Sequence, residues 1–383
     1  MARAPRTIDT GNEAPPESDR LDGWPHPRET FTLAGHAEAE AAMADAIASH
    51  RLHHAWLIAG EEGIGKATFA YRVARFLLAQ ESEDLPQDVP TLALPQDHKA
   101  VRQVTNLAHP GLLVMRRAWD ASAKKFKQSI AIDDIRQVRH FLQRTSVTPW
   151  RVVIVDAADD LNQNSANALL KSLEEPPPRT VFLLVASAPG GLLPTIRSRC
   201  RTLHLSPLDA DHVTQAVTEA CRAGGRDLPP ETQLSTLLAM ANGSPRRVLQ
   251  LMDGGGLKLF ELLLTILESL PHTDWTAVHK LISLTGPRAG EAHAMAFDLL
   301  EEALADAMNG RLTGNGRHAT FPQLKRFSRL ITADSLADWS ELWETIRQMR
   351  GEAERLNLDK AALTLTVFDR IGQTAQRAAS ARV

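Results

Sequence analysis

The stretch from Gly60 to Thr68 has the residue types and spacing of a loop that binds phosphate groups. It contains Gly60, Gly63 and Gly65, followed by Lys66. Such a loop needs glycines so that backbone N–H groups can surround the phosphates, a lysine to neutralise their charge, and a hydroxyl group to hold Mg²⁺. The hydroxyl position is Ala67 here, and Thr68 lies one residue further on, rotated by about 100° around a helix. The stretch therefore predicts a degenerate nucleotide site, in which ATP binding stays open and hydrolysis is not expected.

The residues on either side of this loop predict the strand–loop–helix context that a phosphate loop requires. A buried strand is expected at 55–59, and apolar residues recur at helical spacing after the loop, at Phe69, Val73 and Phe76. The alternative is that the glycines only shape a strand-to-helix turn. The complete context favours the nucleotide site over that alternative.

A second half of the same site is predicted at Asp156. This carboxylate ends the apolar strand 151–156, where nucleotide sites of this kind hold magnesium. In an active ATPase of the common type an acidic residue follows and polarises the attacking water, but Ala157 follows here. Asp159 stands at the wrong distance from the strand end to be assumed a replacement. Two missing catalytic groups indicate a subunit that does not hydrolyse ATP.

The composition describes an ordinary soluble protein of two or three domains. The 383 residues are 43% hydrophobic, and 43 basic against 46 acidic residues give a net charge of −3, so any contact with DNA must be local. The two cysteines, Cys200 and Cys221, are too few for a disulfide scaffold or a four-cysteine zinc site. They fit a reducing cytoplasm, and no apolar run reaches membrane-spanning length.

Strands alternate with helices between about Phe31 and Leu205, which predicts an α/β fold with a parallel sheet covered on both faces. The expected strands are 55–59, 111–115, 151–156, 180–186 and 201–205, and the expected helices are one from Lys66, 133–144 and 165–175. Residues 1–28 show little periodicity and are predicted to be a mobile tail. The stretch 81–109 is predicted to be a loop or small insert. Basic residues around Trp119 and Phe126 predict a solvated hairpin loop, with a phosphate-contacting patch as the alternative.

Beyond Pro207 only helices are predicted. They are expected at 257–270, 275–284, 290–308, 321–332 and 334–355, with a last helix capped by Asp359. The expected domains are the tail at 1–28, a P-loop core domain at 29–206, a helical lid at 207–253 and a C-terminal all-α domain at 257–378.

Three further segments resemble the AAA+ clamp-loader subunits of bacterial DNA polymerase III. They are 167–177, which ends in Leu-Glu-Glu-Pro-Pro, the strand segment 182–185, and 196–200, which ends in Ser-Arg-Cys. The resemblance covers about residues 30–375 and is strongest at 150–205. It implies an AAA+ P-loop core, a lid and a C-terminal helical collar that joins a five-subunit ring. Because both catalytic groups are missing, the non-hydrolysing type of subunit is the nearest match.

The resemblance also implies roles for three residues. The arginine of Ser-Arg-Cys, Arg199, would project into the ATP site of the adjacent subunit and stabilise the transferring phosphoryl group there. The alternative for Arg199 is a surface ion pair. Ser187 occupies the place of a polar sensor of the γ-phosphate, and Arg246 that of a second sensor from the lid. Either residue could equally be a capping or surface residue.

The partners that the resemblance implies are gamma/tau-like ATPase subunits, a delta-like subunit, the sliding clamp and primer-template DNA. Many subunits of the non-hydrolysing type carry a four-cysteine zinc module after the first helix, but residues 81–110 contain no cysteine. We therefore expect no zinc and no required cofactor.

The leading hypothesis is a scaffold subunit that supplies Arg199 in trans and helps to load the clamp during DNA replication. The rival is an active ATPase motor subunit that uses Thr68 and Asp159 in unusual positions. A small-molecule kinase with a P-loop is a third interpretation, which leaves Ser-Arg-Cys and the helical C-terminal third unexplained.

Overall fold

The computed structural model describes residues 15–82, 84–145, 147–286, 290–313, 321 and 324–380. The chain divides into two compact units. The first consists of Met1–Leu228 and Ala241–Arg247, and the second of Pro229–Met240 and Val248–Val383. The residues of the expected lid, 207–253, are shared between these units.

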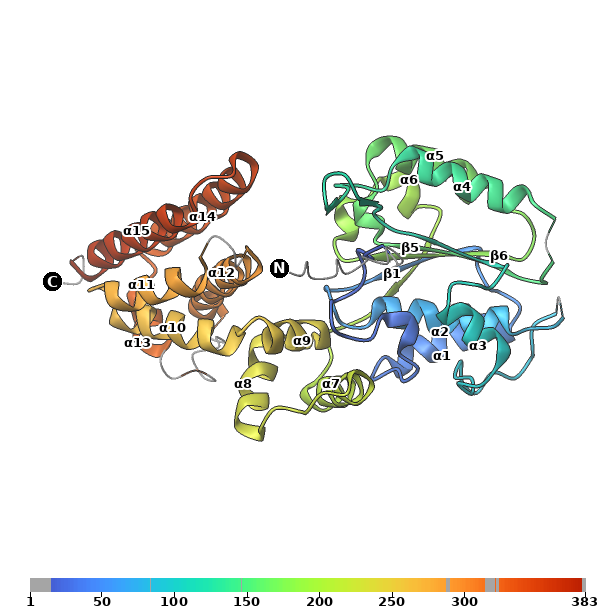
Figure 1. Cartoon of the computed structure of the whole chain (residues 1–383), viewed down its shortest axis with the longest axis horizontal. Coiled ribbons are helices and arrows are strands. Elements are labelled where there is room, and N and C mark those ends of the chain that lie inside the picture. Colours follow the sequence, from blue (N-terminus) through green and yellow to red (C-terminus); the bar gives the residue numbers. More distant parts are fainter. Residues whose placement is uncertain are drawn as a thin grey trace, which may run out of the picture. The chain divides into compact units, whose positions relative to one another are not determined.

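A five-stranded parallel sheet forms the centre of the first unit (Figure 1). Its strands are β1 (Ala55–Ala59), β2 (Leu112–Met115), β5 (Arg151–Asp156), β6 (Thr180–Ala186) and β7 (Arg201–His204). They are ordered β2-β5-β6-β1-β7, and all neighbours pair in parallel. Each strand lies within one residue of its expected bounds, so the predicted fold class is confirmed.

Helices cover both faces of this sheet (Figure 1). One face carries α1 (Ala37–Ala48), α2 (Lys66–Leu78) and α3 (Lys99–Thr105), and the other carries α4 (Ile132–Gln143), α5 (Gln163–Glu174) and α6 (Pro194–Arg197). Side chains of a strand alternate between the two faces. Trp56 and Ile58 of β1 therefore join one buried cluster, while Ala55 and Leu57 join the other. Burial on both sides explains why the strand is apolar at every position.

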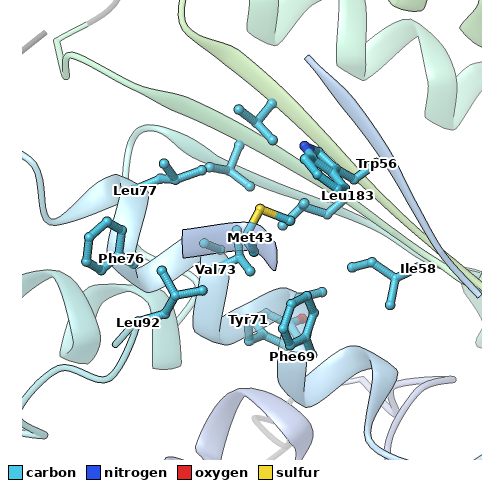
Figure 2. Packing of buried hydrophobic residues seen from close by; sticks show 14 of the residues in the cluster. Met43, Trp56, Ile58, Phe69, Tyr71, Val73, Phe76, Leu77, Leu92 and Leu183 are labelled. Atoms are coloured by element: carbon cyan, nitrogen blue, oxygen red, sulfur yellow. The ribbon is translucent and has the colours of Figure 1, made fainter. Parts of the chain in front are cut away.

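The cluster on the α2 face assembles residues from segments that lie far apart in the sequence (Figure 2). Phe69 and Val73 of α2 are fully buried in it with Met43 of α1. Leu92, from the stretch 81–109, also belongs to it and is 1% exposed. This stretch contains the helix α3, which the weak periodicity did not predict. The His98 ring accepts a hydrogen bond from the Ala100 N–H, 3.2 Å away, and so caps that helix.

The predicted hairpin is confirmed. The strands β3 (Trp119–Asp120) and β4 (Lys125–Phe126) pair antiparallel, separately from the main sheet. The Trp119 and Phe126 rings meet edge to face with their centroids 5.0 Å apart. This contact holds the two short strands together.

The remaining helices follow the expected all-α pattern. The helix α7 (Ala210–Gly224) lies in the first unit, and α8 (Glu231–Ala241) and α9 (Pro245–Asp253) each cross a boundary between the units. The second unit continues with α10 (Gly256–Ser269), α11 (Trp275–Leu284), α12 (Gly290–Thr313), α13 (Leu324–Leu330), α14 (Leu336–Leu356) and α15 (Lys360–Ser380). Figure 1 shows α14 and α15 side by side. The Asp359 carboxylate accepts the Ala361 N–H at 2.7 Å, which confirms it as a cap. None of the described helices is long and apolar enough to cross a membrane.

The expectation of a mobile tail at 1–28 is wrong for residues 15–28; residues 1–14 lie outside the described part. Residues 15–29, the N-terminal segment, pack on the first unit. Trp24 is 3% exposed, and its ring lies under the Arg226 guanidinium, 4.3 Å from the centroid. The segment ends in a short helix, Pro27–Glu29, which His26 and Glu29 cap reciprocally. Its polar composition suggested disorder, but its charged groups find partners inside the fold.

An ion-pair network fixes the N-terminal segment to the residue that follows β2. The Arg116 guanidinium lies 2.5 Å from Glu17 Oε1 and 3.2 Å from Asp19 Oδ1. Burial alone would raise the pKa of Asp19, but the nearby His26 ring and Arg116 outweigh it and hold this pKa below its usual value. The Arg28 guanidinium adds a second cation, 2.8 Å from Glu17. The segment is thus held by charges that are largely removed from water.

Removing Arg116 should destabilise the protein far more than removing an exposed arginine. Arg116→Ala leaves the buried Asp19 carboxylate with one cation fewer, and we expect it to lower the free energy of unfolding by about 2–4 kcal/mol in a urea titration. Arg136→Ala is the matched control, because the side chains of its ion pair with Asp133 are 72% and 74% exposed. It should change stability by less than about 1 kcal/mol. Equal losses in both variants would show that the network does not hold the segment.

Candidate functional site

The three glycines of the predicted loop all adopt backbone conformations that other residues rarely take. Their φ angles are +154° at Gly60, +77° at Gly63 and +107° at Gly65. A Cβ atom at Gly60 would lie 2.3 Å from the Leu205 carbonyl oxygen, and one at Gly63 would lie 2.3 Å from Ser244 Oγ. The loop therefore has the conformation that its glycine pattern predicted.

The Lys66 side chain is enclosed by the loop that it ends. Lys66 is 4% exposed, and its ammonium group donates to the Gly60 carbonyl at 2.8 Å and to the Ser187 hydroxyl at 3.0 Å. It also donates to the Glu61 carbonyl. Burial lowers the pKa of Lys66, while the Asp156 carboxylate acts in the opposite direction. The tertiary structure thus brings together Lys66 and Ser187, the predicted sensor at the end of β6.

Asp156 lies at the carboxyl end of β5, on the same edge of the sheet. Burial raises the pKa of Asp156 to about 7, and the Asp19 carboxylate acts in the same direction. The positive charges of Lys66 and Arg246 oppose this shift. Burial and the Asp19 carboxylate thus favour the protonated form of Asp156, and a metal ion would have to displace that proton in order to bind.

Asp159 is bound to the backbone beside Ser187. Its two carboxylate oxygens accept the Ser187 N–H at 2.6 Å and the Ala188 N–H at 3.1 Å. These bonds connect the turn after β5 to the end of β6. Asp159 therefore orients the residue that contacts Lys66, which its distance from the strand end along the sequence did not indicate.

Arg246 lies over the loop in the first turn of α9. Its backbone N–H donates to the Gly63 carbonyl at 3.3 Å, and its guanidinium donates to the Asp19 carbonyl, also at 3.3 Å. The guanidinium Nε lies 3.9 Å from a Glu62 carboxylate oxygen. In the described part of the chain this buried Nε atom has no hydrogen-bond partner. Arg246 is therefore close to the loop, as predicted, and keeps one buried donor for an anion.

These residues fit a phosphate group but not the magnesium chemistry of hydrolysis. The glycine conformations, Lys66 and the unbonded Arg246 Nε suit a bound anion. Ala67 offers no oxygen ligand, and Thr68 lies one position further along α2. Among the described residues, no group of three His, Cys, Asp or Glu side chains could hold a metal ion.

Arg199 lies apart from these residues in the sequence, just after α6. Its guanidinium forms an ion pair with the Glu174 carboxylate at 2.7 Å and donates to the Thr195 carbonyl at 3.0 Å. The Arg199 side chain is 36% exposed. The expected alternative, a surface ion pair, is thus present in this chain by itself.

Sequence reasoning did not predict the contacts of four residues around these groups. Glu174 lies in the Leu-Glu-Glu-Pro-Pro segment that carries the resemblance, but nothing in the sequence indicated that it pairs with Arg199. His36 follows Gly35 directly before α1, and its Nε2 lies 2.7 Å from the Ile64 carbonyl oxygen in the loop. Asp159 was judged by its distance along the chain alone. Nothing in the sequence indicated a role for Asp19, because the residues around it have the composition of a mobile tail.

Gly63→Ala tests the contact between the loop and α9. Gly63 combines a φ of +77° with added-Cβ distances of 2.3 Å to Ser244 Oγ and 2.6 Å to Arg246 Cβ. We expect the free energy of unfolding to fall by roughly 2–4 kcal/mol in a urea titration. Gly225→Ala is the control, because it has a φ of +63° and no atom within 4 Å of the added Cβ. It should cost only about 1 kcal/mol. A Gly63 variant no worse than the Gly225 variant would show that the loop and α9 do not meet.

Asp156→Asn tests the raised pKa of this carboxyl group. With a pKa of about 7, the folded state binds more protons than the unfolded state between about pH 4 and pH 7. Asp156 therefore makes the wild type lose stability as the pH rises through that window, by at most about 1.4 kcal/mol per pH unit. The stability of Asp156→Asn relative to the wild type should rise from pH 5 to pH 7 and level off above pH 8.

Urea titrations across this pH range provide the measurement. Asp88→Asn, which changes an exposed carboxylate after α2, should show no such trend. A flat difference for Asp156→Asn as well would contradict the raised pKa.

Comparisons with known proteins find similar chains among the subunits of DNA polymerase III. A family model described as DNA polymerase III, delta subunit, matches residues 35–209. The delta-prime subunit of DNA polymerase III from Pseudomonas aeruginosa is 34% identical over 217 residues, which is 54% of this chain and 57% of that protein. The delta-prime subunit from Escherichia coli is 32% identical over 233 residues, or 59% of this chain and 62% of that protein.

A solved structure of a DNA polymerase III gamma subunit-related protein from Thermotoga maritima covers 88% of this chain and 99% of its own, with a TM-score of 0.40 and 19% identity. The chain spans less than two thirds of the length of the two delta-prime relatives that it matches. Residues 35–209 of this chain are therefore similar to the DNA polymerase III, delta subunit family, and the chain is similar to the delta-prime subunits of DNA polymerase III.

Proposed function

We propose that this protein is a non-hydrolysing, delta-prime-type subunit of a clamp loader, which helps to place a sliding clamp on primed DNA during replication. One observation carries the proposal. Alanine stands at 67 and 157, where a motor needs a hydroxyl and a carboxylate, and Asp159 is bound to the backbone N–H groups of 187 and 188. The phosphate-binding half of the site is kept without the groups that hydrolyse ATP.

The proposed contribution to catalysis is made in trans by Arg199. Its planar guanidinium carries a fixed charge and five N–H donors, which suit the oxygens of a phosphoryl group in transfer. Arg199 is partly exposed and belongs to a short segment that the buried Ile196 anchors to the first unit. The nucleotide would belong to the neighbouring ATPase subunit.

The chain's own loop has a binding role at most in this proposal. Gly60, Gly63, Gly65 and Lys66 would hold the phosphates of a nucleotide, with Arg246 above them. Hydrolysis in this site is not expected, because Asp156 and Thr68 do not complete a magnesium site. The proposal requires no cofactor and no zinc.

The proposed partners are gamma/tau-like ATPase subunits and a delta-like subunit in the cytoplasm, with the clamp and the primer-template DNA reached through the complex. The names of the delta-prime relatives support membership in the DNA polymerase III assembly. DNA polymerisation would belong to other chains of the assembly. The second unit, which is entirely helical in its described residues, would act as the collar that joins the ring.

The rival function, an active motor subunit, would need Asp159 as the base that polarises water. Both oxygens of that carboxylate accept backbone N–H groups, so the Ser187 and Ala188 backbone determines how the carboxylate is oriented. A motor would hydrolyse ATP when purified alone. We expect no turnover from this chain by itself and turnover only after it is mixed with its ATPase subunits.

Arg199→Ala should leave this chain folded and assembled while it abolishes hydrolysis at the neighbouring site. The measurement uses a reconstituted loader in which only the ATPase subunit next to this chain keeps its phosphate-loop lysine, so that turnover reports one site. Loss of an arginine finger should lower kcat about 1000-fold or more. Arg197→Ala, which changes an exposed arginine two residues earlier, is the control and should stay within about twofold of the wild type. Unchanged turnover with Arg199→Ala would overturn the assignment.

A further inference from the structure

An ion pair in the first unit joins two of the three sequence segments that carry the clamp-loader resemblance. Glu174 is the last residue of α5 and lies in Leu-Glu-Glu-Pro-Pro, whereas Arg199 lies in Ser-Arg-Cys after α6. Their side chains form an ion pair at 2.7 Å. Pro176 and Pro177 follow Glu175 directly, and a residue before proline disfavours the helical conformation. The prolines therefore help to end α5 where its last carboxylate can reach Arg199.

The contact holds the guanidinium from two directions. One terminal nitrogen binds Glu174, and the other donates to the Thr195 carbonyl at 3.0 Å. Behind it, Ile196 is fully buried, and burial raises the pKa of the neighbouring Cys200 thiol to about 11. The base of this segment is fixed in the core, so Glu174 and Thr195 determine where the exposed end of Arg199 points.

The ion pair is exposed enough for another anion to take the place of Glu174 on the Arg199 guanidinium. The side chains of Arg199 and Glu174 are 36% and 44% exposed, and ion pairs this open to water are weak. A phosphoryl group carries more negative charge than a carboxylate and also accepts hydrogen bonds from guanidinium N–H groups. It can therefore replace Glu174 when a neighbouring site approaches, without leaving a deeply buried charge unpaired.

We propose that Glu174 is the positioning residue for Arg199. Its ion pair limits the arrangements of the guanidinium before assembly, so that less side-chain freedom is lost when Arg199 engages the neighbour's nucleotide. Glu174 itself touches no reacting atom. This inference rests on the proposed role of Arg199 in trans and adds to it a reason for the Leu-Glu-Glu-Pro-Pro motif.

The test compares Glu174→Gln with Glu175→Gln in the single-site loader described above. The adjacent Glu175 is an exposed carboxylate of the same motif, so its variant controls for the loss of one charge. We expect Glu174→Gln to lower kcat about three- to tenfold with KM within twofold of the wild type, and Glu175→Gln to leave both within twofold. Glu174→Asp, which keeps the charge on a shorter side chain, should recover part of the lost rate. Size-exclusion chromatography checks that every variant assembles.

The double variant Glu174→Gln/Arg199→Ala separates positioning from any independent effect. If Glu174 acts only by positioning Arg199, it has no effect once Arg199 is removed. The kcat of the double variant should therefore equal that of Arg199→Ala alone. A further fall in kcat in the Arg199→Ala background would overturn the inference, as would wild-type or increased turnover with Glu174→Gln alone. If Arg199→Ala lowers kcat and Glu174→Gln does not, only this inference fails. If Arg199→Ala has no effect, the proposed function fails with it.

Discussion

Parallel pairing of β5, β6 and β1 is the constraint on which the site depends. Parallel strands end at the same edge of a sheet, so Asp156, Ser187 and the glycine loop meet although more than a hundred residues separate the first and last of them. The buried Lys66 ammonium then needs acceptors, because an unpaired charge in the interior is costly. The loop carbonyls and Ser187 supply them, and Asp159 holds Ser187 in place. Each polar group at this edge thus depends on the strand order.

The N-terminal segment adds a second layer of charge to the same edge. It brings the Asp19 carboxylate close enough to contribute to the raised pKa of Asp156, and its backbone accepts a hydrogen bond from Arg246. The negative charge of Asp19 raises the pKa of Asp156 in addition to burial, and the positive charges of Lys66 and Arg246 lower it. Ala67, at the start of α2, offers no side-chain oxygen to a metal ion.

The parts of the chain that would act on a neighbour are built differently from the loop. Lys66 is almost fully enclosed, whereas Arg199 and Glu174 are each more than a third exposed. A group that serves the chain's own fold gains from burial and multiple partners. A group that acts on another subunit must keep a partner that can be displaced. This contrast agrees with a subunit whose lysine is held within its own fold and whose arginine is presented to a neighbour.

The fold class, the strand bounds to within one residue, the glycine-dependent loop conformation and the alanines at 67 and 157 could all be read from the sequence. These features are local, since they follow from apolar runs, glycine spacing and residue identity. The contacts between residues that are distant in the chain became known only from the tertiary structure. It folded residues 15–28 onto the core, formed α3 within a stretch of weak periodicity, bound Asp159 to the end of β6, and joined Glu174 to Arg199. Those outcomes depend on charges and side chains that are distant in the chain and meet only after the sheet has formed, so no local pattern could predict them.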